Sequence, residues 1–396
     1  MIPFLKPYFN FQELYALLSA EKKSIENFEK TFAKFFGSRF ALSFSSGRNA
    51  LYCVLKALDI YNSEIILPAY TCVVVAHAIV LSKNTPVFVD ISLHDFNMDL
   101  DSIDKMLSSK TKAIIATSLF GYPIRIDKIR KICEKDILVI HDCALAPGVK
   151  LNGIDFNDES DVMIFSLNVR KPITALGGGM ITTNNKDLYE KVKSFRDKNL
   201  KKYSLSQKII KSLFFLSQFV AFNKMIYGFT DYLVNETHLL DKFLVDYSED
   251  TDNIPEYYFK PLLNLQAKIG LIQLSKYNEM INKRREIAKF YYENLINEKS
   301  IILPPLIDGA VYSHYSVRVK NRQRFIANMR RKGISIGNYF DYCIPDLNVY
   351  REYKRGEYPN SVLCSNEVVN LPNHPGLSYK ELNYIVNTIV GLGAHL

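Results

Sequence analysis

Short apolar runs alternate with helix-like stretches along the first half of the chain, beginning at Phe40. The apolar runs predict strands at 65–67, 86–90, 113–117, 137–140, 162–165 and 180–183. Strands separated by helical patterns indicate an α/β domain with a mostly parallel sheet. Ligands of such sheets bind beyond the carboxyl ends of the strands, where we expect Phe120, Asp142 and Ser166.

The second half of the chain has a different pattern. It predicts one long helix, then a strand and two more helices, at 262–298, 310–319, 322–332 and from Ser378 onward. This order is typical of a smaller α+β domain. We therefore expect a large domain over 1–250 and a small C-terminal domain over 251–396.

A mostly apolar segment, about 203–250, lies between these two parts and predicts a helical insertion. Plotted as a helix, it has a narrow polar stripe with apolar residues around the rest, and the stripe contains Lys208, Lys211, Ser212 and Gln218. Three further lysines lie just upstream, at Lys198, Lys201 and Lys202. Two interpretations are open: a helix on a membrane surface over about 205–230, or a helix buried against the body or a partner subunit.

Composition excludes several classes of protein. The 396 residues are 48% hydrophobic and 23% charged, as in ordinary globular proteins. The net charge of +9 allows acidic partners without choosing among them, and no nucleic-acid-binding motif is evident. The six cysteines form no CxxC pair, so we expect no metal site and free thiols in a reducing cytoplasm. No apolar run is long enough for a spanning helix, and the first ten residues do not support a signal peptide.

Four features with chemical potential occur in a fixed order. Residues 45–51 form a small-residue turn that opens a helix, and such a turn suits a phosphate. Asp142 ends a strand, Ser166 lies five residues before Lys171, and glycines follow at 177–179. Pyridoxal phosphate (PLP) requires an amine for an imine, an acid opposite its pyridine nitrogen and donors for its phosphate. Each feature alone is commonly structural, but together they fit a PLP site.

Several blocks then resemble one family over nearly the whole chain. They include SSGRNALYCVLKAL, ILVIHDCALAPGVKLNG, FSLNVRKPITALGGGMITTN and LQAKIGLIQLSKYNEMINKRREIAKFYYENL. The chain resembles the DegT/DnrJ/EryC1/StrS sugar aminotransferases, which have the fold-type-I aspartate aminotransferase architecture. The resemblance implies an α/β fold, with a three-layer α/β/α large domain, a mostly parallel sheet and a smaller α+β C-terminal domain.

The resemblance also implies roles for individual residues. Lys171 would be the catalytic lysine that forms the imine with PLP, and Asp142 would pair with the pyridine nitrogen. The other cofactor-binding positions would be Ser166, Gly47, Arg48, Asn49 and Cys72. On the substrate side we place His314, Asn338 and Tyr339.

Some positions depart from the family pattern. Cys72 replaces the aromatic residue that usually stacks on the cofactor ring, and Leu145 replaces a glutamine. Phe259 stands where an asparagine usually reaches the neighbouring subunit's phosphate, and Asn338 replaces a histidine. The lysine and the acid remain, so the PLP assignment stands.

The predicted function is a PLP-dependent transfer of an amino group from glutamate to a nucleotide-linked keto-sugar, in surface polysaccharide or glycolipid biosynthesis. We expect a cytoplasmic homodimer and no nucleic-acid partner. Peripheral contact at the inner membrane face through about 205–230 is one of the two open interpretations of the insertion, and packing against the protein is the more common outcome for such a helix. Two alternatives remain: another PLP reaction on a lipid-linked or non-sugar substrate, and a non-catalytic regulatory protein of the same fold.

Overall fold

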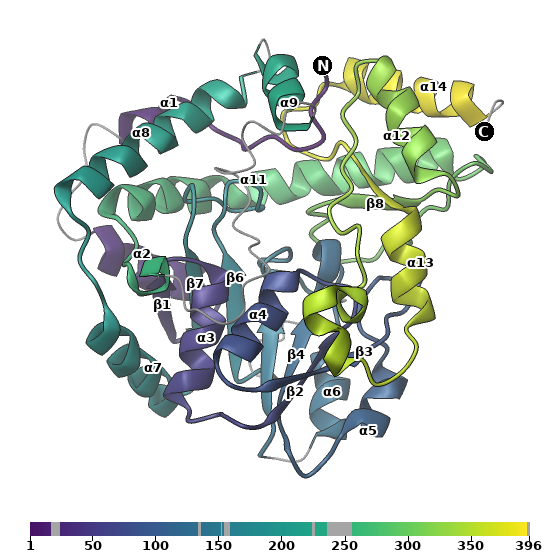
Figure 1. Cartoon of the computed structure of the whole chain (residues 1–396). Coiled ribbons are helices and arrows are strands. Elements are labelled where there is room, and N and C mark those ends of the chain that lie inside the picture. The colour runs from purple at the N-terminus through teal and green to yellow at the C-terminus, as the bar shows by residue number, and fades with distance from the viewer. Residues whose placement is uncertain are drawn as a thin grey trace.

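A single seven-stranded sheet organises the larger part of the protein (Figure 1). This computed structural model describes residues 1–16, 24–133, 136–151, 153, 159–223, 226–235 and 256–393. The strand order is β1-β7-β6-β5-β4-β2-β3. The strands are β1 (Phe40–Phe44), β2 (Glu64–Pro68), β3 (Thr85–Val89), β4 (Thr111–Thr117), β5 (Leu138–Asp142), β6 (Val162–Ser166) and β7 (Gly179–Thr183).

All neighbouring strands pair in parallel except β7, which runs antiparallel to both β1 and β6. The prediction of a mostly parallel sheet is therefore confirmed. Because the other strands share one direction, their carboxyl ends meet at one edge of the sheet. The amino end of β7 lies at that same edge, where Gly179 pairs with Ser166.

Helices cover both faces of the sheet, which explains why its strands are apolar on both sides. One face packs against α3 (Gly47–Ala57), α4 (Val73–Leu81) and α7 (Lys186–Asn199). The other face packs against α2 (Ser24–Phe35) and α11 (Asn264–Leu295) at one end, and against α5 (Ile103–Met106) and α6 (Ile126–Ile132) at the other. These are the three layers that the sequence predicts.

The C-terminal part contains a two-stranded sheet of β8 (Tyr315–Arg318) and β9 (Val368–Leu371), with α12 (Arg322–Arg331), α13 (Pro359–Glu367) and α14 (Tyr379–Gly393). The helix α11 agrees with the long predicted helix. The strand expected over 310–319 is shorter, because its first half forms a loop against Gly121, whose carbonyl accepts a hydrogen bond from the Val311 N–H at 2.8 Å. The division into domains at residue 250 stays a prediction.

The two halves of the chain share one hydrophobic core. Cys343, Ile344, Tyr350 and Tyr358 are buried in the same cluster as α3, α4 and the strands beneath them. At the opposite end of the sequence, Ile2 forms an isolated β-bridge with Ile334. Contacts between residues far apart in the sequence therefore join the N-terminal and C-terminal parts of the chain.

The predicted helical insertion begins with α8 (Leu205–Ala221), followed by α9 (Tyr227–Asn235). Ser204 caps α8: its hydroxyl accepts from the Gln207 N–H at 3.2 Å, and the Gln207 side chain accepts from the Ser204 N–H at 3.1 Å. In Figure 1, α8 lies above α11 with α1 (Phe11–Ala16) behind it. The rest of the insertion, 236–250, lies outside the described residues. Within the described part, no helix is both long and apolar enough to cross a bilayer.

Candidate active site

A tight turn connects β1 to α3 at the carboxyl edge of the sheet. Ser46 caps α3 by accepting a hydrogen bond from the Asn49 N–H at 3.1 Å. The first N–H groups of the helix, which have no partner inside it, point out of this turn. A side chain at Gly47 would place its Cβ 3.3 Å from the Phe165 carbonyl oxygen and 3.4 Å from Cβ of Ser166. The structure thus brings Gly47 and Ser166 together, as expected for two parts of one phosphate site.

The glycines at 177–179 lie directly against this turn. Ser46 forms a β-bridge with Gly178. A Cβ on Gly179 would lie 2.3 Å from the Ser46 carbonyl carbon and 2.4 Å from the Gly47 nitrogen. Because both of these atoms belong to the backbone, only glycine permits the contact. The three glycines therefore let two chain segments close around the helix N-terminus.

Lys171 lies on a loop whose two ends are hydrogen-bonded to each other. The Leu167 N–H donates to the Gly178 carbonyl and the Gly177 N–H donates to the Leu167 carbonyl, each at 2.9 Å. Within the loop, the Lys171 N–H donates to the Asn168 carbonyl at 3.0 Å. This closure fixes the lysine beside the strand that ends in Ser166.

Lys171 is partly exposed as a residue, but its amine is buried and its Nζ lies 5.3 Å from the ring centroid of Tyr339. Burial on its own lowers the pKa of this lysine. The neighbouring Tyr339, Cys72 and Asp142 outweigh that effect and raise the Lys171 pKa above its ordinary value. The amine is therefore held as a cation, and it must give up its proton before it can act as a nucleophile.

Asp142 ends β5 and is buried, with 8% of its surface exposed. Its carboxylate accepts a hydrogen bond from the Ala144 N–H at 2.9 Å. Burial raises the Asp142 pKa, and the Ala144 N–H and the Lys171 charge oppose that rise. A buried carboxylate of this kind is stabilised by a nearby cation, such as a protonated ring nitrogen.

His314 and Tyr339 form the side of the site that belongs to the C-terminal part. Their rings are 4.5 Å apart between centroids, and the Tyr339 ring also faces Lys171. Burial, with the charges of Lys171 and Arg284, lowers the His314 pKa well below its ordinary value. The imidazole is thus neutral. Its Nδ1 lies 3.2 Å from the Ser313 hydroxyl, while its buried Nε2 has no hydrogen-bond partner among the described residues. Asn338, the third predicted substrate residue, is exposed beside them.

Cys72 occupies the N-cap position of α4 and is partly buried. Burial raises the pKa of its thiol, despite the opposing charge of Lys171, so the group is neutral. The next residue, Val73, donates its N–H to the Tyr342 hydroxyl at 3.1 Å. The thiol therefore adds no charge to the site.

The turn between β1 and α3, residues 45–47, which we call the phosphate turn, contacts Tyr258. The sequence places the adjacent Phe259 near a phosphate through the family resemblance, but it does not reveal the contacts of the Tyr258 carbonyl. The buried Asn49 side chain donates to the Tyr258 carbonyl, and the Ser45 hydroxyl donates to the same oxygen at 3.3 Å. The Arg48 guanidinium lies 5.5 Å from the centroid of the Tyr258 ring. The Asn49 side chain thus fastens the turn to the segment that precedes α11. Its backbone remains at the helix N-terminus.

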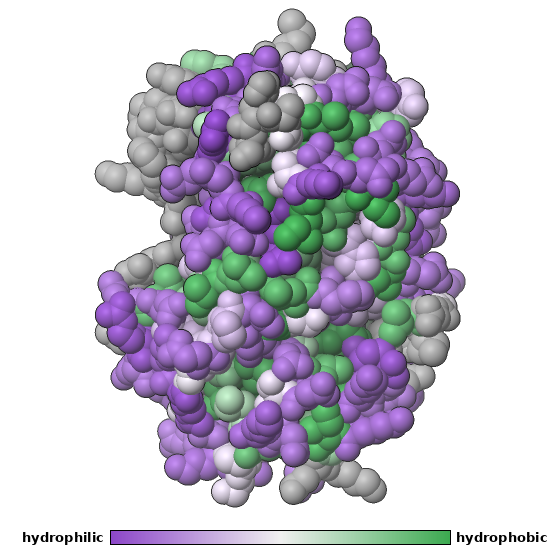
Figure 2. Space-filling model, turned by 90° about the vertical axis from the view of Figure 1, so that its right-hand side faces the viewer, coloured by the Kyte–Doolittle hydropathy of each residue, from purple (hydrophilic) through white to green (hydrophobic). Residues whose placement is uncertain are grey.

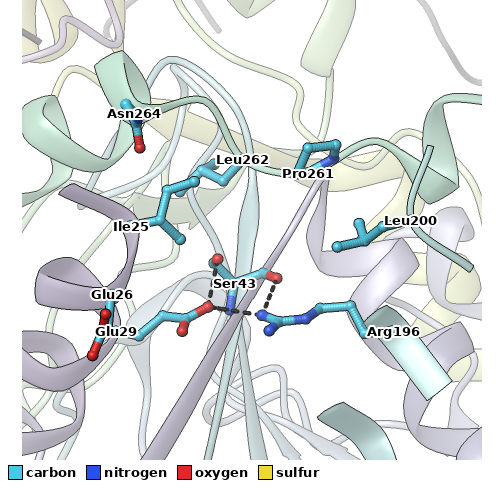
Figure 3. A pocket seen from close by; sticks show the side chains of 9 residues that line it. All are labelled: Ile25, Glu26, Glu29, Ser43, Arg196, Leu200, Pro261, Leu262 and Asn264. Atoms are coloured by element: carbon cyan, nitrogen blue, oxygen red, sulfur yellow. Dashed lines mark hydrogen bonds and ion pairs between the residues drawn. The ribbon is translucent and has the colours of Figure 1, made fainter. Parts of the chain in front are cut away.

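A separate cavity of about 290 Å³ lies beside β1 (Figure 3). At its floor, Glu29 accepts from both the N–H and the hydroxyl of Ser43, each at 2.7 Å. Arg196 pairs with Glu29 at 2.8 Å and donates to the Ser43 carbonyl at 3.2 Å. These polar groups are hydrogen-bonded to one another. We therefore assign them a structural role, which is to hold β1, the edge strand that precedes α3.

The residues present fit PLP. The glycine-lined helix N-terminus supplies donors for a phosphate, the Lys171 amine lies on the closed loop next to it, and Asp142 lies at the end of the neighbouring strand. Among the described residues, no cluster of three His, Cys, Asp or Glu side chains could hold a metal ion.

Comparison with known proteins places this site in context. The model of the DegT/DnrJ/EryC1/StrS aminotransferase family matches residues 16–225 and 254–390. The chain is 29% identical over 372 residues to dTDP-3-amino-3,6-dideoxy-alpha-D-galactopyranose transaminase of Aneurinibacillus thermoaerophilus, covering 92% of this chain and 89% of that protein. It is 27% identical over 379 residues to GDP-perosamine synthase of Escherichia coli O157:H7, covering 94% and 91%.

The fold is similar to that of solved aminotransferases. The structure of Helicobacter pylori PseC, an aminotransferase involved in the biosynthesis of pseudoaminic acid, superposes with a TM-score of 0.80 over 99% of both chains, at 21% identity. This likeness confirms the architecture. The chain therefore belongs to the DegT/DnrJ/EryC1/StrS aminotransferase family.

Proposed function

We propose that this aminotransferase binds PLP through Lys171 and moves an amino group from glutamate to a nucleotide-linked keto-sugar, in surface polysaccharide or glycolipid biosynthesis. The observation that carries the proposal is the meeting of the glycine-lined helix N-terminus, the Lys171 loop and Asp142 at one edge of the sheet. The relatives named as dTDP- and GDP-sugar enzymes support the substrate class.

Bound PLP would supply an electron-accepting ring that stabilises negative charge on the carbon losing its proton. Ser166, the Gly47 backbone and the N–H groups at the start of α3 would hold the phosphate. Asp142 would hold a proton on the ring nitrogen, since its buried carboxylate favours a cationic partner.

Lys171 would carry the cofactor covalently and, once released, take up and return a proton as base and acid. Tyr339, Cys72 and Asp142 raise the pKa of the free Lys171 amine despite its burial, so the amine would have to lose its proton before it attacks the cofactor. The neutral His314 and the Tyr339 ring would border the substrate on the side that belongs to the C-terminal part.

We further propose that the protein works as a homodimer in the cytoplasm, in contact with the inner face of the membrane through α8. All six cysteines are free, which supports a reducing compartment. The family resemblance supports the dimer, with residues of both subunits in each site.

Borohydride reduction of the PLP-loaded protein, followed by peptide mapping, tests the attachment site. The label is expected on Lys171, and Lys171→Ala should lose both the label and turnover of glutamate with a nucleotide-linked keto-sugar. Lys191→Ala, a change at an exposed lysine on α7, is the matched control and should retain both. A label on another lysine would overturn the assignment.

A further inference from the structure

The helix α8 packs against the body through Phe215 and through part of its polar stripe, Lys211 and Gln218. Phe215 is fully buried and Gln218 is 8% exposed. The Lys211 amine is partly buried and donates to the Tyr203 hydroxyl at 2.7 Å. Two polar side chains therefore lie on the side of α8 that contacts the protein, whereas Lys208 at the start of the helix is exposed.

The opposite side of α8 is an exposed apolar stripe, which we call the α8 stripe. Its members are spaced by four, four, three and four positions, which places them on one side of a helix. They are between 41% and 74% exposed, and they are Leu205, Ile209, Leu213, Leu216 and Val220. The stripe extends about 22 Å along the helix axis. A continuous apolar surface of this length marks an interaction site.

The α8 stripe also differs from the flank at the right of Figure 1. Figure 2 shows that flank, on which several hydrophobic areas are separated by hydrophilic side chains. By contrast, no polar residue interrupts the α8 stripe along its five positions. The α8 stripe is therefore more continuous than the hydrophobic areas on that flank.

The charge around the stripe has one sign. Residues 198–223 contain five lysines and no aspartate or glutamate. Four of these lysines are exposed: Lys198, Lys201, Lys202 and Lys208. The nearest upstream acid, Asp197, is paired with Arg196 at 2.9 Å. The apolar stripe is thus accompanied by positive charge that no acidic residue within 198–223 balances.

We propose that the α8 stripe docks on an anionic lipid surface. An apolar helix face with basic neighbours is the arrangement of helices that lie in a bilayer interface, where anionic headgroups attract the lysines. A second copy of the chain fits less well. A twofold contact brings the same patch of both subunits together, so it would set these lysines against one another.

The inner side of α8 contacts the loop that carries the proposed catalytic lysine. Phe215 packs with Leu176 of that loop and with Leu265 and Ile269 of α11, and Val169 packs against the same cluster. Docking would therefore hold the Lys171 loop about one helix diameter, roughly 10 Å, from the lipid. The inference concerns binding alone, so it can fail while the proposed amino transfer holds.

Flotation of the full-length, PLP-loaded protein tests the proposal. Vesicles of phosphatidylcholine alone are compared with vesicles that also contain phosphatidylglycerol, at low and high salt. The protein is expected to float with the anionic vesicles and to be released by salt, because surface charges are screened. Failure to float with anionic vesicles at low salt would overturn the proposal.

Two double variants separate the contributions of the stripe and the charge. Ile209→Ser with Leu213→Ser should abolish flotation, whereas Val390→Ser, a change at an exposed valine on α14, should not. Lys201→Glu with Lys202→Glu should lower the partition coefficient by at least roughly tenfold, since each basic residue near an anionic surface contributes about a factor of five.

Circular dichroism and light scattering accompany each measurement. If the serine variant does not fold, the exposed lysine pair still decides the question. Equal flotation of the lysine variant and Val390→Ser would overturn the proposal. A dimeric parent that becomes monomeric in the Ile209 and Leu213 variant, without any change in flotation, would assign the stripe to a second copy instead.

Discussion

Replacing Gly179 by alanine tests how the phosphate turn is built. The added Cβ would lie 2.3 Å from the Ser46 carbonyl carbon and 2.4 Å from the Gly47 nitrogen. Both are backbone atoms, so no side-chain rotation relieves the clash, and the turn must move away from β7. Overpacking of this kind costs about 1–3 kcal/mol.

The effect on cofactor binding depends on which part of the structure moves to relieve the clash. If it displaces the turn that donates to the phosphate, PLP affinity should fall roughly 5- to 150-fold, since about 1.4 kcal/mol corresponds to tenfold. Turnover at saturating PLP should fall as well, because a misplaced cofactor reacts poorly.

The assay is a spectroscopic titration of the apoprotein with PLP, together with thermal unfolding of the apo and loaded forms. Gly356→Ala is the matched control, because a Cβ there meets nothing within 4 Å. The reasoning is refuted if Gly179→Ala folds and binds PLP as tightly as the control. It is also refuted if stability of the apoprotein drops while the PLP affinity stays the same.

Three further changes test other parts of the molecule. Asp142→Asn should retain some PLP but lose most of the turnover, measured in a coupled transamination assay, because a neutral amide cannot stabilise a ring cation; near-normal activity would contradict this role. Gly121→Ala should cost about 1–3 kcal/mol in the free energy of unfolding, because φ is +96° and the new Cβ would lie 2.7 Å from the Tyr312 nitrogen; an unchanged denaturant midpoint would contradict it. Burial lowers the pKa of the Lys211 amine from 10.5 to about 8. Between these two pH values the unfolded chain holds the Lys211 proton and the folded protein does not, so the free energy of unfolding should rise as the pH increases from 8 to 10.5. In thermal unfolding measured over this pH range, Lys211→Met should reduce the rise in stability and Lys208→Met should not. Equal pH dependence of the two variants would refute the assignment of this effect to Lys211.

Much of the sheet could be predicted because its strands are buried on both faces. Each therefore appears as an apolar run, and Asp142 and Ser166 follow from their place at strand ends. The loop over 310–314 could not be predicted in the same way. Its residues are as apolar as a strand, but Gly121 allows a backbone approach that replaces strand pairing with the contact to Val311.

The orientation of α8 is a second feature that could not be predicted from the sequence. Periodicity separates the polar and apolar sides of the helix, but it does not say which side faces the protein. Here Tyr203 gives the Lys211 amine a hydrogen-bond partner, so this part of the polar side can lie against the protein. The tie between Asn49 and the Tyr258 carbonyl has no sequence signature, because a backbone oxygen can come from any residue.

The shared hydrophobic core has a consequence for biosynthesis. Helices α3 and α4, complete by Leu81, are packed against Tyr350 and Tyr358. About 270 residues separate Leu81 from Tyr350, and at ribosomal rates of about 5–20 residues per second they take roughly 15–50 s to synthesise. During this time the apolar face that later receives the two tyrosines has no cover from its own chain. A nascent chain in that state is a client for a chaperone, and a product truncated before Tyr350 would be expected to aggregate rather than persist as a folded cofactor-binding fragment.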